Sequence, residues 1–342
     1  DPEKVPSLAL TVGVGTVMAA REVMIMDLLI KGGTIVTAKE SFAADVAVKD
    51  GKIVAIGKDL PFEAEKVVDA SGRLVLPGAL DVHTHMAMPF GGTVSADSYL
   101  SGTRAAACGG VTTIFDYPVQ HKGQTILGLC GEKNDVLAKE ACVDYAFHCC
   151  ITDLNGGAIL DEMEEAVKKG ITSFKCFLVY KKENMMVDDA TLTRLLLRAK
   201  ELGAMINVHA ENPDMISFYT ERLKAEGHLA PVNHSYSRPP VTEEDAVRHA
   251  IAMAQVADVP LFIVHVSTKG AMEAVREAYA GGQSVFGETC THYLVLDTSY
   301  LALPDFEGAK YVCAPPLRTK EHQEALWEGI DRGWLNAVSS DH

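Results

Sequence analysis

The segment ALDVHTH, at residues 79–85, begins a pattern in which a short apolar run precedes a longer amphipathic stretch. Seven further apolar runs follow: VTTIFDYP (111–118), YAFHCCIT (145–152), SFKCFLVY (173–180), MINVHAE (205–211), LFIVHVS (261–267), SVFGETC (284–290) and NAVSSDH (336–342). Between them, apolar residues recur with a period near 3.6, as in 158–169, 189–202, 243–257 and 321–332. This alternation predicts parallel strands covered by helices.

The number of these units selects one architecture. Eight strand–helix units in roughly 250 residues are typical of a (β/α)8 barrel, whose functional groups lie at the carboxyl ends of the strands. We therefore predict an α/β protein with a TIM-like (β/α)8 barrel over residues 77–342. The sequence stops at His342, at the end of the eighth expected strand, so the barrel is expected to lack its last helix.

A different pattern precedes the barrel. Residues 26–76 contain short β-branched runs separated by turn residues, among them DLLIKGG, TIVTA, DVAVKDGKIVAIG and KVVDASGRLVL. The Asp50–Gly51 pair between two such runs is a strong hairpin signal. We expect a small, incomplete antiparallel β domain of the β-sandwich type.

The composition of the chain excludes some classes of binding partner. The chain of 342 residues has 46 acidic and 31 basic residues, and its net charge of -15 would repel a phosphate backbone. No apolar run reaches the ~18 residues needed to span a bilayer, and the eight cysteines contain no CxxC pair. We therefore expect a cytoplasmic protein that binds neither nucleic acid nor membrane, and that acts on small neutral molecules or protein partners.

Residues 1–25 look foreign to the rest of the chain. The run KVPSLALTVGVGTVMAAREVMI, at residues 4–25, resembles a fragment of glucosamine-6-phosphate deaminases, and it is too short to carry that family's active site. We interpret it as a foreign-looking extension produced by a fusion. The alternative is an added strand or helix that packs on the main domain.

Metal-binding residue types follow several of the predicted strands. His83 and His85 are two residues apart on one strand, so their side chains share a face. Two core histidines would give the same pattern. However, His209, His265 and Asp341 also lie near the carboxyl ends of predicted strands, which meet at one mouth of a barrel. We therefore predict a metal site, with zinc favoured and manganese, cobalt or iron as alternatives.

Lys175, in SFKCFLVY, extends this group. A protonated lysine has no lone pair for a cation, but burial lowers the pKa of an amine. A neutral amine can add carbon dioxide to form a carbamate, whose two oxygens can bridge two metals. The alternative is a lysine at a strand end that pairs with a carboxylate.

The combined motifs resemble the dihydropyrimidinase and D-hydantoinase family of the amidohydrolase superfamily. The phrases that carry the resemblance are GALDVHTHMAMPFGGT, SFKCFLVY, INVHAENPD, IVHVS, FEGAKYVCAPPLR and VSSDH, and it extends over Met26 to His342. It implies a two-metal centre held by His83, His85, His209, His265, Asp341 and Lys175 as a carbamate. It also implies a homotetramer or homodimer in the full-length form, and relatives that continue beyond His342.

The resemblance also implies an activity. Members hydrolyse the cyclic amide bond of dihydropyrimidines or 5-substituted hydantoins to N-carbamoyl amino acids, using hydroxide activated by the metals. Asp341 would transfer the proton to the leaving ring nitrogen, and Tyr180 would hydrogen-bond the substrate carbonyl oxygen. Ala314, where members commonly have serine, would contact substrate through its backbone.

The residues after the HxH motif bear on the substrate. Met86, Ala87 and Met88 form an apolar segment, which favours an uncharged ring. Phe90 and Phe177 are candidates for a hydrophobic wall around a ring substituent, with ordinary core packing as the alternative.

Three other functions remain open on the sequence. One is a metal-free scaffolding protein related to dihydropyrimidinases, although such proteins lack the metal histidines. Another is a different hydrolase of the superfamily, such as an aminohydrolase or a phosphotriester hydrolase. The third is an inactive truncated fragment.

Overall fold

The structure is a computed structural model that describes residues 25–90 and 92–342. The chain divides into two compact units, with the division after Gly78. The expectation of a foreign-looking extension at residues 1–25 falls almost wholly on residues 1–24 and so lies outside the described residues.

The first unit contains a single sheet within its described residues. Its strands are β1 (Met26–Val36), β2 (Ser41–Lys49), β3 (Lys52–Gly57), β4 (Ala64–Asp69) and β5 (Leu74–Val75). The sheet order is β3-β2-β1-β4, and β5 also pairs with β1. The hairpin at Asp50–Gly51 is present, and both residues have positive φ, as a tight two-residue turn requires.

The pairing of this sheet corrects the prediction of an antiparallel domain. β2 pairs antiparallel with β1 and β3, but β4 and β5 pair with β1 in parallel. The chain leaves β3 at one edge and returns at the opposite side of β1, so β4 enters in the direction of β1. Residue alternation predicts which segments are strands but does not determine their partners. The described residues of this unit form one sheet and not a sandwich of two.

The second unit contains the parallel strands. They are β6 (Ala79–Thr84), β9 (Val111–Asp116), β10 (Asp144–Phe147), β11 (Cys149–Cys150), β12 (Ser173–Phe177), β13 (Met205–His209), β14 (Leu261–Ile263), β15 (Val285–Cys290) and β16 (Ala337–Ser339). Because β10 and β11 are separated only by His148, the described residues form eight parallel strand segments, in sheets ordered β10-β9-β6 and β11 to β16. A short hairpin of β7 (Pro89–Phe90) and β8 (Thr93–Val94) follows β6.

Hydrogen bonds also join the first and last of these segments. The backbone N–H of Ser340 donates to Asp81 Oδ1 at 3.1 Å, and the N–H of His85 donates to the carbonyl of His342 at 2.5 Å. These bonds bring the carboxyl ends of β6 and β16 together. As a result, residues from opposite ends of the second unit meet at one place.

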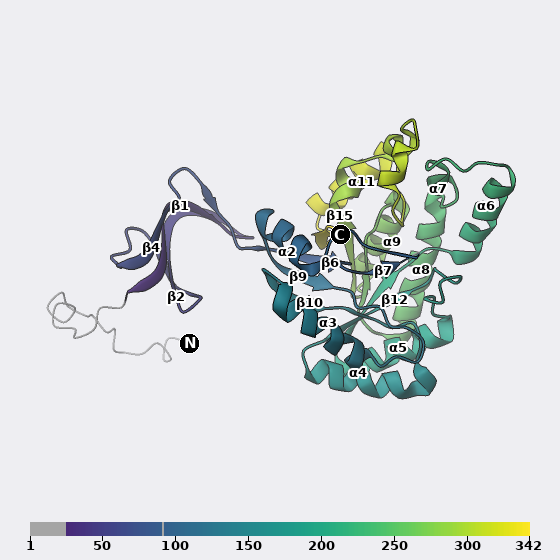
Figure 1. Ribbon diagram of the computed structural model, residues 1–342, viewed down its shortest axis with the longest axis horizontal. Helices are drawn as coiled ribbons and strands as arrows, with labels where there is room; N and C mark the ends of the chain where they lie inside the picture. The colour runs from purple at the N-terminus through teal and green to yellow at the C-terminus, as the bar shows by residue number, and fades with distance from the viewer. Residues whose placement is uncertain (1–24, 91) are drawn as a thin grey trace. The chain divides into compact units, whose positions relative to one another are not determined.

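Helices cover the strands on the outside in this unit (Figure 1). They are α2 (Tyr99–Cys108), α3 (Ile126–Glu140), α4 (Ala158–Lys168), α5 (Asp189–Leu202), α6 (Pro213–Ala225), α7 (Asn233–Tyr236), α8 (Pro240–Ala257), α9 (Lys269–Ala280), α10 (Thr291–Val295) and α11 (Lys320–Asp331), with 3₁₀ turns at Asn155–Gly157, Thr298–Ala302 and Glu307–Tyr311. The ends of α5 show how the local sequence determines where a helix begins and ends. Asp188 caps its first turn, and Gly203 ends it at φ 64°. Its buried Leu192, Leu195 and Leu196 belong to the core beneath the strands. In the part of the chain that the structure describes, no helix is both long and apolar enough to cross a membrane.

Candidate metal centre

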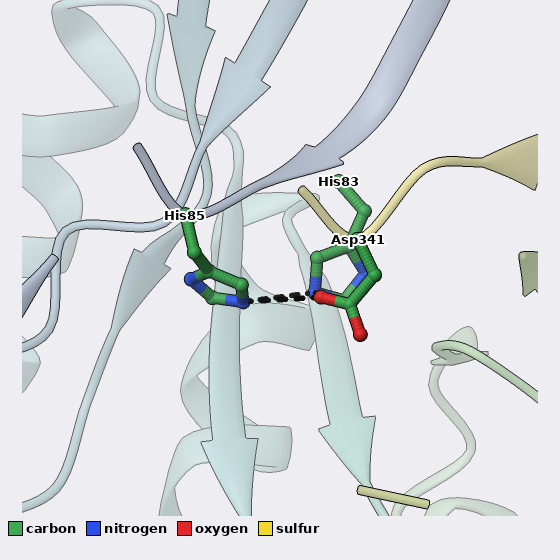
Figure 2. Close-up of side chains that lie close together, drawn as sticks. All are labelled: His83, His85 and Asp341. Atoms are coloured by element: carbon green, nitrogen blue, oxygen red, sulfur yellow. Dashed lines mark hydrogen bonds and ion pairs between the residues drawn. The ribbon is translucent and has the colours of Figure 1, made fainter. Parts of the chain in front are cut away.

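Three of the predicted ligands meet where β6 and β16 end. Nε2 of His83 lies 3.2 Å from Nε2 of His85. Asp341 Oδ1 lies 3.3 Å from the first of these nitrogens and 3.5 Å from the second. Figure 2 shows the two imidazoles directed toward each other with the carboxylate beside them, and the three ligand atoms lie within 4.8 Å of one another. The arrangement follows from the strand period, since residues two apart share a face.

Lys175 joins this group from β12. Its side chain is fully buried, and its Nζ lies 2.9 Å from His83 Nε2 and 4.4 Å from the centre of the Tyr117 ring. Burial lowers the pKa of the Lys175 amine. Among the described residues Lys175 forms no ion pair with a carboxylate, in contrast to the simpler interpretation of a lysine paired at a strand end.

His209 and His265 form a second pair beside the first. Their ring centres are 4.3 Å apart in an edge-to-face arrangement, and the His265 ring lies 5.4 Å from that of His83. Nε2 of His209 lies 2.9 Å from a carboxylate oxygen of Glu211. His265 follows β14 by two residues, so both members are carried by adjacent parallel strands.

The backbone holds several of these side chains in an uncommon conformation. Tyr180, His265 and Asp341 have φ values of 67°, 39° and 52°. Non-glycine residues in the left-handed region each cost on the order of 1 kcal/mol, and they concentrate at functional sites because the surrounding structure must hold them there. Three such residues around one small pocket indicate that the local fold is arranged around these side chains.

A cavity of about 110 Å³ lies among these residues. Its lining consists of predicted metal ligands, predicted substrate contacts and two methionines: His85, Lys175, His209, His265 and Asp341; Phe90, Phe177, Tyr180 and Ala314; Met88 and Met185. The Tyr180 ring lies 5.1 Å from His209, 5.7 Å from Phe90 and 5.8 Å from Phe177. Phe177 is buried, while Phe90 is 41% exposed. His83 is behind this lining and touches the site through its Nε2.

The chemistry of these donors fits a divalent cation. Burial, together with neighbouring basic groups, holds the pKa values of His83, His85 and His265 well below the ordinary value of 6.5, so the imidazoles are neutral and have free lone pairs. Nδ1 of His85 is buried without a hydrogen-bond partner among the described residues. Burial raises the pKa of Asp341 to about 6, although Lys175 opposes this effect. A half-buried carboxylate among neutral imidazoles is a ligand set that zinc and related metals bind.

Three further residues of the site were not expected from the sequence. Glu288 contacts His83 Nδ1 at 2.6 Å, Glu211 contacts His209, and the Tyr117 ring stacks on His83 with 4.2 Å between ring centres. Burial raises the pKa of Glu288. Burial acts to raise the pKa of Glu211 as well. Arg238 and His209 together have the larger effect and lower the pKa of Glu211 to about 2. The signal that could have found both glutamates is a charged residue within or just after an apolar strand, where an unpaired charge is costly.

A TIM-like α/β fold with histidines and an aspartate at its strand ends defines a class of metal-binding barrel proteins. Comparison with known proteins specifies the family. The family model described as "Amidohydrolase family" matches residues 74–341. The chain is 46% identical over 287 residues to a D-hydantoinase of Geobacillus stearothermophilus, which covers 84% of this chain and 60% of that protein. It is 42% identical over 278 residues to a dihydropyrimidinase of Arabidopsis thaliana, covering 81% and 52%.

Solved structures agree with these relatives. The crystal structure of a dihydropyrimidinase from Brevibacillus agri matches with a TM-score of 0.90 and 46% identity, covering 92% of this chain and 68% of that one. An L-hydantoinase from Arthrobacter aurescens matches with a TM-score of 0.82 at 28% identity, covering 93% and 69%. The chain belongs to the amidohydrolase family. It spans about three fifths or less of the length of the two curated relatives named above.

Proposed function

We propose that the protein hydrolyses a cyclic amide bond, opening dihydropyrimidines or 5-substituted hydantoins to N-carbamoyl amino acids. The observation that carries this proposal is the meeting of His83, His85 and Asp341 beside Lys175 at one end of a small pocket. The similarity to D-hydantoinases and dihydropyrimidinases supports the substrate class. The alternative of a metal-free scaffolding protein is not favoured, because the candidate ligands are present and close together.

The proposed cofactor is a pair of divalent cations, with zinc favoured and manganese, cobalt or iron as alternatives. The proposed ligands are the four histidines at positions 83, 85, 209 and 265, Asp341, and Lys175 as a carbamate. A cation bound there would polarise a carbonyl and make water a nucleophile near neutral pH. In its neutral form, which burial favours, the Lys175 amine has the lone pair that attacks carbon dioxide, and the nitrogen then loses one proton.

Asp341 is the proposed proton carrier. Its carboxylate lies beside the two imidazoles, at the edge of the cavity. It accepts the proton of the attacking water and delivers that proton to the ring nitrogen as the N–C bond breaks. One group can serve both steps because the attacked carbon and the leaving nitrogen are bonded neighbours.

Tyr180 and the aromatic residues are the proposed substrate contacts. The Tyr180 hydroxyl stays protonated because burial raises its pKa, so it can donate a hydrogen bond to the oxygen that gains charge. Phe90 and Phe177 flank Tyr180 and present apolar surface to a ring substituent. The backbone of Ala314, on the cavity wall, is the proposed contact to the ring amide.

The organisation of the protein is part of the proposal. Residues 26–76 form a small β domain, and residues 77–342 form the barrel that carries the chemistry. In its working form we propose a homotetramer or homodimer in the cytoplasm.

The activity is tested with zinc-loaded protein. Incubation with dihydrouracil and with 5-phenylhydantoin is expected to yield the N-carbamoyl amino acids, measured by chromatography with mass detection. An adenine-like substrate and an organophosphate triester are expected to remain unchanged. Turnover of either control compound, with both rings intact, would contradict the proposed substrate class.

The carbamate is tested separately. Protein supplied with ¹³C-bicarbonate is expected to show one carbamate carbon signal by ¹³C NMR, and the Lys175→Gln variant is expected to lack it. The matched control is Lys133→Gln, which changes a lysine outside the metal site. A wild-type spectrum without the signal, in protein that holds two zinc equivalents, would exclude the modification.

A further inference from the structure

Two buried glutamates each contact one of the candidate histidines. Glu288, on β15, lies behind His83, and Glu211, just past β13, lies beside His209. Both side chains are completely buried. Each glutamate touches a different ring nitrogen: Glu288 contacts Nδ1 of its histidine, whereas Glu211 contacts Nε2.

We propose that Glu288 and Glu211 are positioning residues that hold His83 and His209 in opposite tautomers, with His83 protonated on Nδ1 and His209 protonated on Nε2. The inference rests on the metal site of the proposed function. It assigns the nitrogen that each histidine offers: Nε2 for His83 and Nδ1 for His209.

The hydrogen-bond partners of Glu288 determine the tautomer of His83. Its Oε1 accepts from the hydroxyl of Ser339 at 2.9 Å and from the backbone N–H of His265 at 3.3 Å. Because Oε1 already accepts from these two donors, we assign it as an acceptor toward His83 as well, so that His83 Nδ1 at 2.6 Å supplies the hydrogen.

The hydrogen-bond partners of Glu211 determine the tautomer of His209 in the same way, with an arginine as the other donor. Arg238 Nη1 lies 2.5 Å from Glu211 Oε2, and a guanidinium has five N–H donors and no acceptor. The oxygen between Arg238 and His209 is therefore an acceptor for both. His209 must place its hydrogen on Nε2, 2.9 Å away, which leaves the Nδ1 lone pair free.

The free nitrogen of His83 is directed toward the other candidate ligands. Its Nε2 is the atom 2.9 Å from Lys175 Nζ and 3.2 Å from His85 Nε2. The glutamate therefore directs the lone pair into the site, because a neutral imidazole that donates from one nitrogen can accept only at the other. A partner of this kind typically changes metal affinity by ~10- to 100-fold.

The tautomers can be read directly in the metal-free protein. In protein labelled with ¹⁵N-histidine, long-range ¹H–¹⁵N NMR distinguishes the two neutral tautomers, and His83→Gln and His209→Gln variants assign the two signals. We expect the Nδ1–H pattern for His83 and the Nε2–H pattern for His209. The same tautomer at both positions, or the reverse assignment, would overturn the proposal.

Variants test whether the glutamates cause this arrangement. Glu288→Leu and Glu211→Leu are each expected to mix the tautomers of the contacted histidine and to weaken zinc binding by ~10- to 100-fold, measured by chelator competition. Glu288→Gln keeps an acceptor oxygen and is expected to restore the wild-type tautomer. Circular dichroism confirms folding, and the wild-type spectrum decides the assignment if a leucine variant does not fold.

The matched control is Glu243→Leu. Glu243 is also buried, but its hydrogen-bond partners are Ser267 and Arg318 and include no histidine. Zinc affinity is expected to stay at the wild-type value in this variant, and an equal loss would make the effect merely structural and overturn the proposal. None of these measurements uses a substrate, so failure to open a hydantoin would contradict the proposed function and leave the tautomer assignment intact.

Discussion

The two histidine pairs of the site differ in how completely the fold arranges them. On the His83 side, nitrogen atoms of His83 and His85 and an oxygen of Asp341 already lie within 4.8 Å of one another. On the His209 side, the rings of His209 and His265 pack edge to face, and one nitrogen of His209 is bound to Glu211. The first pair presents a ligand cluster, whereas the second presents packed rings.

The difference has a structural origin. His83 is on β6 and His85 directly follows the end of that strand, and hydrogen bonds between the ends of β6 and β16 place Asp341 against them. His209 and His265 come from separate strands, and His265 has a positive φ. Two histidines that are two residues apart need only the strand period, while ligands from separate strands, such as His265 and Asp341, also need a particular loop conformation. The His83 side, whose ligand atoms already lie close together, is therefore the more preorganised half of the site.

The largest effect is expected at the centre of the His83 side. Asp341→Asn should lower kcat for ring opening by ~10³- to 10⁴-fold, because the amide cannot carry the proton and is a poorer ligand. The measurement is the rate of N-carbamoyl product formation at saturating zinc, with bound zinc determined by mass spectrometry. Asp331→Asn, at the exposed end of α11, is the control. A variant with near wild-type kcat would remove Asp341 from proton transfer.

Tyr180 tests the other half of the pocket. Tyr180→Phe should lower kcat by ~10²- to 10³-fold, or about 2.7 to 4 kcal/mol, because one hydrogen bond to the charged oxygen is lost. Steady-state kinetics should show this loss in kcat with unchanged zinc content. The control is Tyr279→Phe, which removes a hydroxyl from an exposed ring on α9. Equal kcat values for Tyr180→Phe and the wild-type protein would exclude a role in oxyanion stabilisation.

Metal titration tests whether the His83 side is more preorganised for metal binding than the His209 side. If the His83 side is preorganised, His83→Gln should weaken the tightest zinc equivalent by more than ~100-fold, since ligand loss exceeds the usual effect of a supporting residue. His209→Gln should keep that first equivalent and lose the second. Chelator competition with one and two zinc equivalents measures both. Loss of the same equivalent by both variants, or loss of the tighter one by His209→Gln, would contradict greater preorganisation on the His83 side.

Much of the barrel could be predicted from the chain because its strands are marked by apolar runs. Each predicted run contains an observed strand, and the helix predicted at 189–202 is α5. Pairing in the first unit was not predictable, because alternation at β4 says nothing about whether it joins β1 in parallel. The prediction of an antiparallel domain was wrong for this reason.

The candidate site could be predicted for side chains with a strong chemical signal. The HxH motif of His83 and His85 implies proximity through the strand period alone, and the structure brings Asp341 to it. The roles of the buried glutamates could not be predicted, because Glu288 and His83 are 205 residues apart and meet only in the folded protein. Sequence spacing identifies ligands on one strand but does not identify partners between strands.

The smallest effect is expected at the pocket rim. Phe90, 41% exposed, packs edge to face on Tyr180, and such an aromatic pair contributes about 0.5–1.5 kcal/mol. Phe90→Ala should therefore raise KM for 5-phenylhydantoin by ~2- to 10-fold and leave unsubstituted hydantoin almost unaffected, since only the phenyl ring reaches the wall. Phe218→Ala, which removes an exposed ring from α6, should change neither KM. An equal rise in KM for both hydantoins would mean that Phe90 does not recognise the substituent. Its role would then be to support the Tyr180 ring, so that the pocket wall would act on the catalytic group and not on the substrate.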